Sequence, residues 1–161
     1  MTIPTRPTLT RRDWLQHACA GAAALASSTA LAADEDTVRV AWISPQTGAI
    51  AAFGVTDRYA VDLLSPRLNA GIPGPNGKLR KVQVELHDAA SSSARAQALA
   101  RELIASGVHL VLATATPEIC NPVSDVCEAA GVPCVAAIAP WQAWVYGRKG
   151  DPVKGFDWTF H

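Results

Sequence analysis

The sequence has 161 residues, of which 49% are hydrophobic and 17% charged, and its 14 basic residues balance its 14 acidic residues. This length suits one domain, and this composition is typical of a folded globular chain rather than a disordered one. A formal net charge of zero gives no electrostatic reason to expect binding to nucleic acid or to an anionic membrane surface.

The first 33 residues have the features of an export signal. The segment TRRDWLQ contains Arg11 and Arg12, the pair typical of twin-arginine (Tat) signal peptides, and a short apolar run follows it. That run is shorter than the ~20 apolar residues that a membrane-spanning helix needs. Residues 30–32 (ALA) have the small-x-small pattern of a cleavage site. We therefore predict cleavage near Ala32 or Ala33 and a periplasmic, slightly acidic mature chain; the alternatives are a membrane anchor or a buried helix.

The first half of the mature chain predicts two strands, each followed by a helix. Residues 37–44 (TVRVAWIS) are a β-branched, apolar strand, and a helix is expected from about residue 49 to residue 69. Pro66 should kink this helix or end it early. Residues 81–87 alternate apolar and polar side chains, which favours an edge strand, and a helix follows over residues 94–106. The apolar positions expected to pack the first helix on the sheet are Ala52, Val55, Tyr59, Leu63 and Leu64.

The second half repeats the pattern. Residues 107–122 (GVHLVLATATPEICNP) read as a buried strand, a small polar turn and the start of a helix, with Pro117 at its first position. This helix should run to about Ala130, and residues 134–139 form a fourth buried strand. Residues 156–161 begin another apolar segment in which the sequence stops, so we expect a longer protein.

Strands that alternate with helices across short loops predict a doubly wound parallel α/β sheet. Right-handed crossovers then place the turns at residues 45–48, 88–93, 114–116 and 140–144 on one edge of that sheet. Small ligands bind at this edge in open α/β sheets. The sequence thus predicts one ligand-binding edge.

Several kinds of chemistry are missing from the sequence. It contains no GxGxxG, no GxxxxGK[ST] and no GxSxG, which argues against a dinucleotide site, a phosphate loop and a hydrolase elbow. The spacing of cysteines and histidines does not suit zinc, and we expect no metal and no cofactor. His87 and Asp88 are the best candidates for an enzyme site, although Asp is common in turns for capping reasons alone.

Three cysteines lie in the mature part. Cys127 and Cys134 flank a tight turn, so we predict a disulfide between them, which an exported protein can keep. The alternative is two small buried thiols. Cys120 lies about 10.5 Å from Cys127 along the same helix, too far for a bond.

Over residues 38–161 the sequence resembles the type I periplasmic substrate-binding proteins of ABC importers, in their branched-chain amino acid/amide-binding branch. The resemblance rests on the order and spacing of several short segments. The sequence departs from the family pattern at Pro66 and at WQAW, residues 141–144. The segments that carry the likeness are ISPQTGAIAAFG at 43–54, NAGI at 69–72, DAA at 88–90, GVP at 131–133 and AP at 139–140.

The resemblance implies a two-lobed protein that closes on a small-molecule ligand, docks on an ABC permease in the inner membrane and is monomeric at full length. Residues 34–161 would be most of its first lobe. Phe53 matches an aromatic residue that packs on the ligand. Hydroxyl and backbone groups of the turn after the third strand would hold a ligand carboxylate, and the loop after the fourth strand would add contacts. The residues of the turn after the third strand are Thr114, Ala115, Thr116 and Glu118. Those of the loop after the fourth strand are Ala139, Trp141 and Gln142.

Elementary electrostatics bears on these expectations. A helix N-terminus attracts anions, but Glu118 would oppose one if it pointed at the ligand. Trp141 and Trp144 could supply aromatic surface for an apolar or cationic ligand, or could pack against another part of the protein.

Three functions are consistent with the sequence. The first is a non-enzymatic receptor for an importer, the second is a sensing domain coupled to a membrane signalling protein, and the third is an exported α/β enzyme that uses His87 and Asp88.

Overall fold

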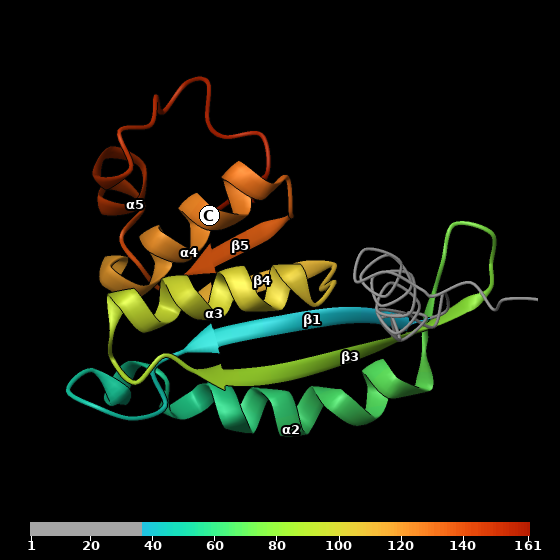
Figure 1. Cartoon of the computed structure of the whole chain (residues 1–161). Helices are drawn as coiled ribbons and strands as arrows, with labels where there is room; N and C mark the ends of the chain where they lie inside the picture. Colours follow the sequence, from blue (N-terminus) through green and yellow to red (C-terminus); the bar gives the residue numbers. More distant parts are fainter. Residues whose placement is uncertain (1–36) are drawn as a thin grey trace, which may run out of the picture. The chain divides into compact units, whose positions relative to one another are not determined.

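The computed structural model describes residues 37–161 (Figure 1), so the predicted signal peptide with Arg11 and Arg12 lies outside the described part. No helix within residues 37–161 is long and apolar enough to cross a membrane. In chain order the elements are β1 (Thr37–Ser44), the 3-10 helix η1 (Ala51–Phe53), α2 (Val55–Ala70), β2 (Ile72–Pro73), β3 (Leu79–Asp88), α3 (Ser93–Ala105), β4 (Leu110–Thr114), α4 (Pro117–Ala130), β5 (Cys134–Ala137), α5 (Trp141–Gly147) and β6 (Thr159–Phe160).

The strands form one sheet in the order β2-β3-β1-β4-β5-β6. All neighbours pair in parallel except β2, which runs antiparallel to the start of β3. The chain moves from β1 to β3 in one direction and from β3 to β4 in the other. Right-handed crossovers therefore put α2 on one face of the sheet and α3 and α4 on the other, as Figure 1 shows. The predicted doubly wound α/β sheet is confirmed.

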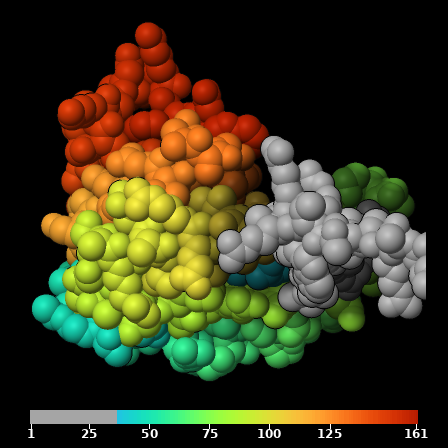
Figure 2. All heavy atoms as spheres, in the orientation of Figure 1, coloured from blue at the N-terminus to red at the C-terminus, as the bar shows by residue number. Residues whose placement is uncertain are grey.

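The main core lies between the sheet and the layer formed by α3 and α4. Small side chains such as Ala96 and Ala100 of α3 let the helix approach the sheet closely, and Ile119 and Val123 of α4 are fully buried. The two helices pack on each other and lie side by side on the face seen in Figure 2.

Helix α2 buries a different face from the one that its apolar residues predict. Val55 and Tyr59 are 71% and 69% exposed, whereas Asp57 and Val61 are buried. The prediction was wrong because it assigned the sheet-facing side by apolar periodicity alone. Asp57 turns inward because polar groups of the sheet bind its carboxylate, and this rotates the apolar residues outward.

Pro66 does not end α2, so the early end given as one alternative for this helix is wrong. The helix continues to Ala70 and stops before Gly71, which has a positive φ of 101°. Pro66 lies on an exposed side of the helix, where water can satisfy the carbonyl group that loses its intrahelical partner. The Ser65 hydroxyl also donates to the carbonyl of Val61 at 2.6 Å, so the turn around Pro66 keeps a local hydrogen bond.

Candidate functional site

The carboxyl ends of the parallel strands meet at one edge of the sheet, as predicted. β1 and β4 are neighbours there, and the chain leaves them in opposite directions across the sheet. This is the topological switch point, where open α/β sheets bind ligands. Ser44 ends β1 and Thr114 ends β4, so these two residues mark the switch point.

A buried carboxylate lies directly at the switch point. Asp57, in the first turn of α2, accepts hydrogen bonds from the Ser44 hydroxyl at 2.5 Å and from the Thr114 hydroxyl at 2.7 Å. The indole N–H of Trp42 donates to the Thr114 oxygen at 2.9 Å. The Thr114 hydroxyl therefore gives its proton to Asp57, and it has no second proton for a ligand carboxylate.

A second carboxylate connects the loops after β1 and β3. Asp88 accepts hydrogen bonds from the Thr47 hydroxyl and from the backbone N–H groups of Gln46, Thr47 and Ala90, at 2.6 to 3.2 Å. Burial raises the pKa of Asp88, but the bonds from Thr47, Ala90 and Gln46 outweigh it, so the pKa lies below its ordinary value. Asp88 thus fixes the shape of two loops at this edge of the sheet.

His87 does not form a pair with Asp88. Its Nε2 lies 3.7 Å from a carboxylate oxygen of Glu85, two residues earlier on β3, whereas Asp88 bonds to Thr47 and to loop backbone. Consecutive residues of a strand point to opposite faces of the sheet. The two side chains are therefore not arranged as a catalytic acid and base.

The backbone at this edge is strained. Four of the five non-glycine residues with positive φ in residues 37–161 follow the ends of β3, β4 or β5: Ala90 at 48°, Ser91 at 56°, Ala115 at 112° and Ile138 at 76°. Such conformations cost on the order of 1–3 kcal/mol each and cluster at functional sites in many proteins. Their concentration in three loops at the same edge of the sheet supports this edge as the site.

The turn between β4 and α4 begins the helix without a side-chain cap. Thr116 is the N-cap residue, but its side chain accepts no hydrogen bond from the helix, and Pro117 at the first helical position has no N–H to offer. Glu118 is exposed in the first turn. Its pKa is lowered first by the nearby Thr116 hydroxyl, although this contact falls short of good hydrogen-bond geometry, and then by its own backbone N–H. An acidic group therefore already occupies the positive end of α4.

The turn between β5 and α5 presents Trp141 and Gln142 to solvent, while Ala139 is buried. The Trp141 ring lies 6.1 Å from that of Tyr146. Trp144 is buried, and its indole N–H donates to Ser124 of α4 at 3.0 Å. Of the two tryptophans considered as ligand contacts, only Trp141 is therefore exposed to solvent.

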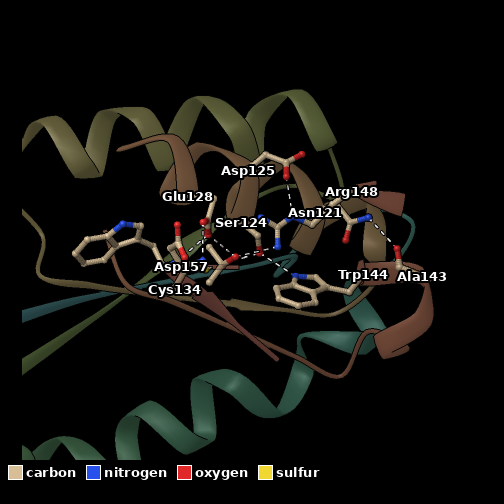
Figure 3. Close-up of polar contacts among 11 residues, drawn as sticks. Asn121, Ser124, Asp125, Glu128, Cys134, Ala143, Trp144, Arg148 and Asp157 are labelled. Carbon is tan, nitrogen blue, oxygen red and sulfur yellow. Dashed lines mark hydrogen bonds and ion pairs between the residues drawn. The ribbon is translucent and has the colours of Figure 1, made fainter. Parts of the chain in front are cut away.

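A cluster of polar contacts holds α5 and β6 against α4 (Figure 3). The Arg148 guanidinium lies over the rings of Trp144 and Phe156, at 4.6 and 3.8 Å from their centroids, and pairs with Asp125 at 2.6 Å. Glu128 accepts bonds from the backbone of Asp157 and Trp158. These contacts fix α5, the helix that carries Trp141 at its start.

The predicted disulfide between Cys127 and Cys134 is not formed in the structure. Both residues and Cys120 are free, fully buried thiols packed between α4 and the sheet. Contact with Cys134 and then burial raise the pKa of the Cys127 thiol, and burial raises the pKa of Cys120 to about 12. The hydrogen bond between the two thiols lowers the pKa of Cys134, but no sulfur–sulfur bond joins them.

The structure brings most of the predicted ligand residues to the same edge, on the loops after β1, β4 and β5. Phe53, Glu118, Trp141 and Gln142 are exposed there, whereas Thr114, Ala115 and Ala139 are buried beneath them. Sequence reasoning missed the network of Trp42, Ser44, Gln46 and Asp57. The available signal was Asp57 itself, which shares a helical face with Val61, four residues on.

Within the described part of the chain, no group of three or more His, Cys, Asp or Glu side chains is arranged to hold a metal ion. A doubly wound parallel sheet whose loops converge on a switch point is a ligand-binding α/β fold. The sequence model of the periplasmic binding protein family matches residues 37–161. The chain belongs to this family.

Solved structures share this fold. LivJ from Streptococcus pneumoniae, a branched-chain amino acid transporter substrate-binding protein solved with isoleucine, is 23% identical with a TM-score of 0.61, over 77% of this chain and 33% of LivJ. A solute-binding protein of an ABC transporter from Rhodopseudomonas palustris BisB5, solved with 3,4-dihydroxybenzoic acid, is 24% identical with a TM-score of 0.60, over 70% of this chain and 30% of that one. The leucine-binding protein LivK from Thermotoga maritima is 24% identical with a TM-score of 0.57, over 70% and 31%.

The part of each relative that the chain matches is therefore about a third of that relative's length. A search of curated proteins gave no match.

Proposed function

We propose that the protein is the substrate-binding component of an ABC importer, and that it captures an amino acid, an amide or a related small polar compound in the periplasm. The observation that carries the proposal is the family match over every described residue, 37–161. In this role the full-length protein is a monomer, not an enzyme, and delivers its ligand to a permease in the inner membrane.

Residues 34–161 would act as the first of two lobes. A ligand at the switch point would meet the ring of Phe53, the exposed side chains of Trp141 and Gln142, and the backbone of the β4–α4 turn at Thr116. A second lobe would then close over it by a hinge motion, which buries the ligand between the lobes. The loops are strained and joined by hydrogen bonds to Asp88, and they support this role because they hold the contact surface in one conformation before the ligand binds.

The ligand class is tested by a thermal-shift screen of the full-length protein. The panel contains branched-chain amino acids, aliphatic amides and aromatic acids such as 3,4-dihydroxybenzoic acid. A ligand at a hundred times its Kd adds about 2.7 kcal/mol to the free energy of unfolding, which should raise the melting temperature by about 5 °C or more. If no member of the panel shifts the melting temperature, the proposed ligand classes are excluded.

A matched pair of variants locates the binding surface. Phe53→Ala removes an exposed aromatic ring at the ligand edge, and Tyr59→Ala removes one from the outward face of α2. The first should weaken a ligand found in the screen by about tenfold, since aromatic contacts contribute on the order of 1 kcal/mol or more, and the second should leave its Kd unchanged. Equal effects of the two variants would contradict the proposed site.

A further inference from the structure

Asp57 is an unusual residue for the interior of this lobe. Among residues 37–161 it is the only buried residue of the Asp and Glu types, with 3% of its surface exposed. Burying a carboxylate costs free energy unless hydrogen bonds replace the lost water. The groups that replace it here all belong to the switch point, which suggests a role beyond packing.

The carboxylate sets the direction of two hydroxyl groups. One oxygen, Oδ2, receives the protons of both Ser44 and Thr114, so each hydroxyl can only accept from its other neighbours. Both do so: Trp42 Nε1 donates to Thr114, and Gln46 Nε2 donates to Ser44, each at 2.9 Å. Asp57 thus lies at the centre of a chain of hydrogen bonds with a single direction.

This series of hydrogen bonds extends to the loop that carries Phe53. Gln46 Nε2 also donates to the carbonyl oxygen of Gly54 at 2.9 Å. A Cβ atom on Gly54 would lie 2.4 Å from the Pro45 carbonyl oxygen and 2.6 Å from Ser44 Oγ, so the backbone packs directly on the network. Phe53 immediately precedes this close contact.

We propose that Asp57 is the positioning residue of the ligand site: its carboxylate takes the hydroxyl protons of Ser44 and Thr114 and thereby holds the loop of Phe53 in register with the β4–α4 turn. The role in binding rests on the proposed function above, while the arrangement of protons does not. Loss of the carboxylate should therefore disturb both halves of the site, even though Asp57 itself lies beneath it.

The test uses the full-length protein labelled uniformly with ¹⁵N, in which the indole N–H of Trp42 and the side-chain amide of Gln46 report on the network. Asp57→Ala removes the carboxylate and Asp57→Asn keeps its shape. Val61→Ala is the control for simple loss of packing on the same face of α2, and Asp62→Asn is the control for the same charge change at an exposed site. The Trp42 resonance is assigned with Trp42→Phe.

We expect both Asp57 variants to shift the Trp42 signal and to speed its hydrogen exchange by about tenfold or more, while the two controls leave it unchanged. For any probe from isoleucine and 3,4-dihydroxybenzoic acid that binds the wild type, Asp57→Asn should raise the Kd by about tenfold, and Val61→Ala should not. The same Trp42 change in Val61→Ala, or an unchanged Kd in Asp57→Asn, would overturn the proposal.

Two further arms keep the outcome decisive. If the Asp57 variants do not fold, Ser44→Ala removes one donor without removing a charge; it should expose the Gln46 side-chain amide to faster exchange, and unchanged exchange would overturn the inference. If the wild type binds neither probe, isoleucine and 3,4-dihydroxybenzoic acid are excluded as ligands, and the Trp42 signal still decides whether Asp57 orders the switch point.

Discussion

The Thr47 hydroxyl donates to the carboxylate of Asp88 across 2.6 Å, and this bond fastens the loop after β1 to the loop after β3. Backbone N–H groups of Gln46, Thr47 and Ala90 bind the same carboxylate. All four donors are best satisfied by an ionised acceptor, which is why the native state lowers the pKa of Asp88 despite partial burial. The ionised form is thus stabilised on folding.

This gives a pH-dependent prediction. Because the native pKa lies below the ordinary value of 3.8, the stabilisation is fully present above that value and is lost as the pH falls through the native pKa. Asp88→Asn should therefore lower the free energy of unfolding at pH 7 by about 1 kcal/mol after solvent screening. The gap between wild type and variant, measured by urea unfolding, should narrow as the pH falls below 3.8. A constant gap would contradict the assignment.

Arg148 should be a major stabilising residue of the α5–β6 region. Its side chain is 1% exposed, stacks on Trp144 and Phe156, and bonds to Asp125 and Thr159. Arg148→Ala should reduce the free energy of unfolding by about 2–4 kcal/mol, measured by urea denaturation. Arg148→Lys should recover only part of this loss, because an ammonium group lacks the planar surface that stacks on the rings.

The matched control for Arg148 is Lys154→Ala, which removes a positive charge from the exposed loop before β6. This variant should stay within about 0.5 kcal/mol of the wild type. If it destabilises the protein as much as Arg148→Ala does, net charge rather than stacking is responsible.

The three core cysteines should remain reduced and unreactive in the folded protein. Burial leaves Cys120 with a pKa of about 12, so almost none of it is thiolate at neutral pH. A thiol reagent should label Cys120, Cys127 and Cys134 at the rate of global unfolding and label all three rapidly in denaturant. A mass lower by two hydrogens, restored by reductant, would instead establish the disulfide first expected between Cys127 and Cys134.

Glu118 should discriminate against anionic ligands. Its exposed carboxylate lies in the first turn of α4, where an anionic ligand group would otherwise be stabilised by the helix. If 3,4-dihydroxybenzoic acid binds the full-length protein, Glu118→Gln should tighten it by about two- to fivefold in calorimetric titration at low salt. A neutral amide from the same panel is the control, and its Kd should not change.

The sequence alone predicted the sheet and the edge where its loops meet, because both follow from strong local signals. β1 is found with its predicted bounds, and α4 begins at Pro117 as expected. Once strands alternate with helices, parallel pairing and right-handed crossovers bring the loops together without further information. The region of the site could therefore be predicted from periodicity alone.

The orientation of α2 and the helix α5 could not be predicted in this way. Asp57 faces inward because hydroxyl groups at residues 44 and 114, distant in sequence, donate hydrogen bonds to its carboxylate. The seven-residue helix α5 has no side-chain cap, and contacts of Trp144 and Arg148 with α4 hold it in place. Such partners become visible only when the chain has folded.

The strained backbone at Ile138 allows stability and binding to be separated. Ile138 has a φ of 76°, which is unfavourable for a β-branched residue, yet 57% of it is exposed directly after β5, at the ligand edge. Ile138→Asn places a residue that tolerates this conformation, and it should raise the free energy of unfolding by about 1 kcal/mol.

The same change should weaken any apolar ligand, because it removes exposed aliphatic surface from the edge where the ligand is expected. Ile72→Asn, at an exposed position of β2 with no positive φ, is the matched control and should not stabilise the protein. Thermal unfolding and calorimetric titration of both variants give the two quantities. Stabilisation without any loss of affinity would mean that the strain at Ile138 is unrelated to the site. Stabilisation with lost affinity would show that the strained Ile138 is kept because it contributes to binding.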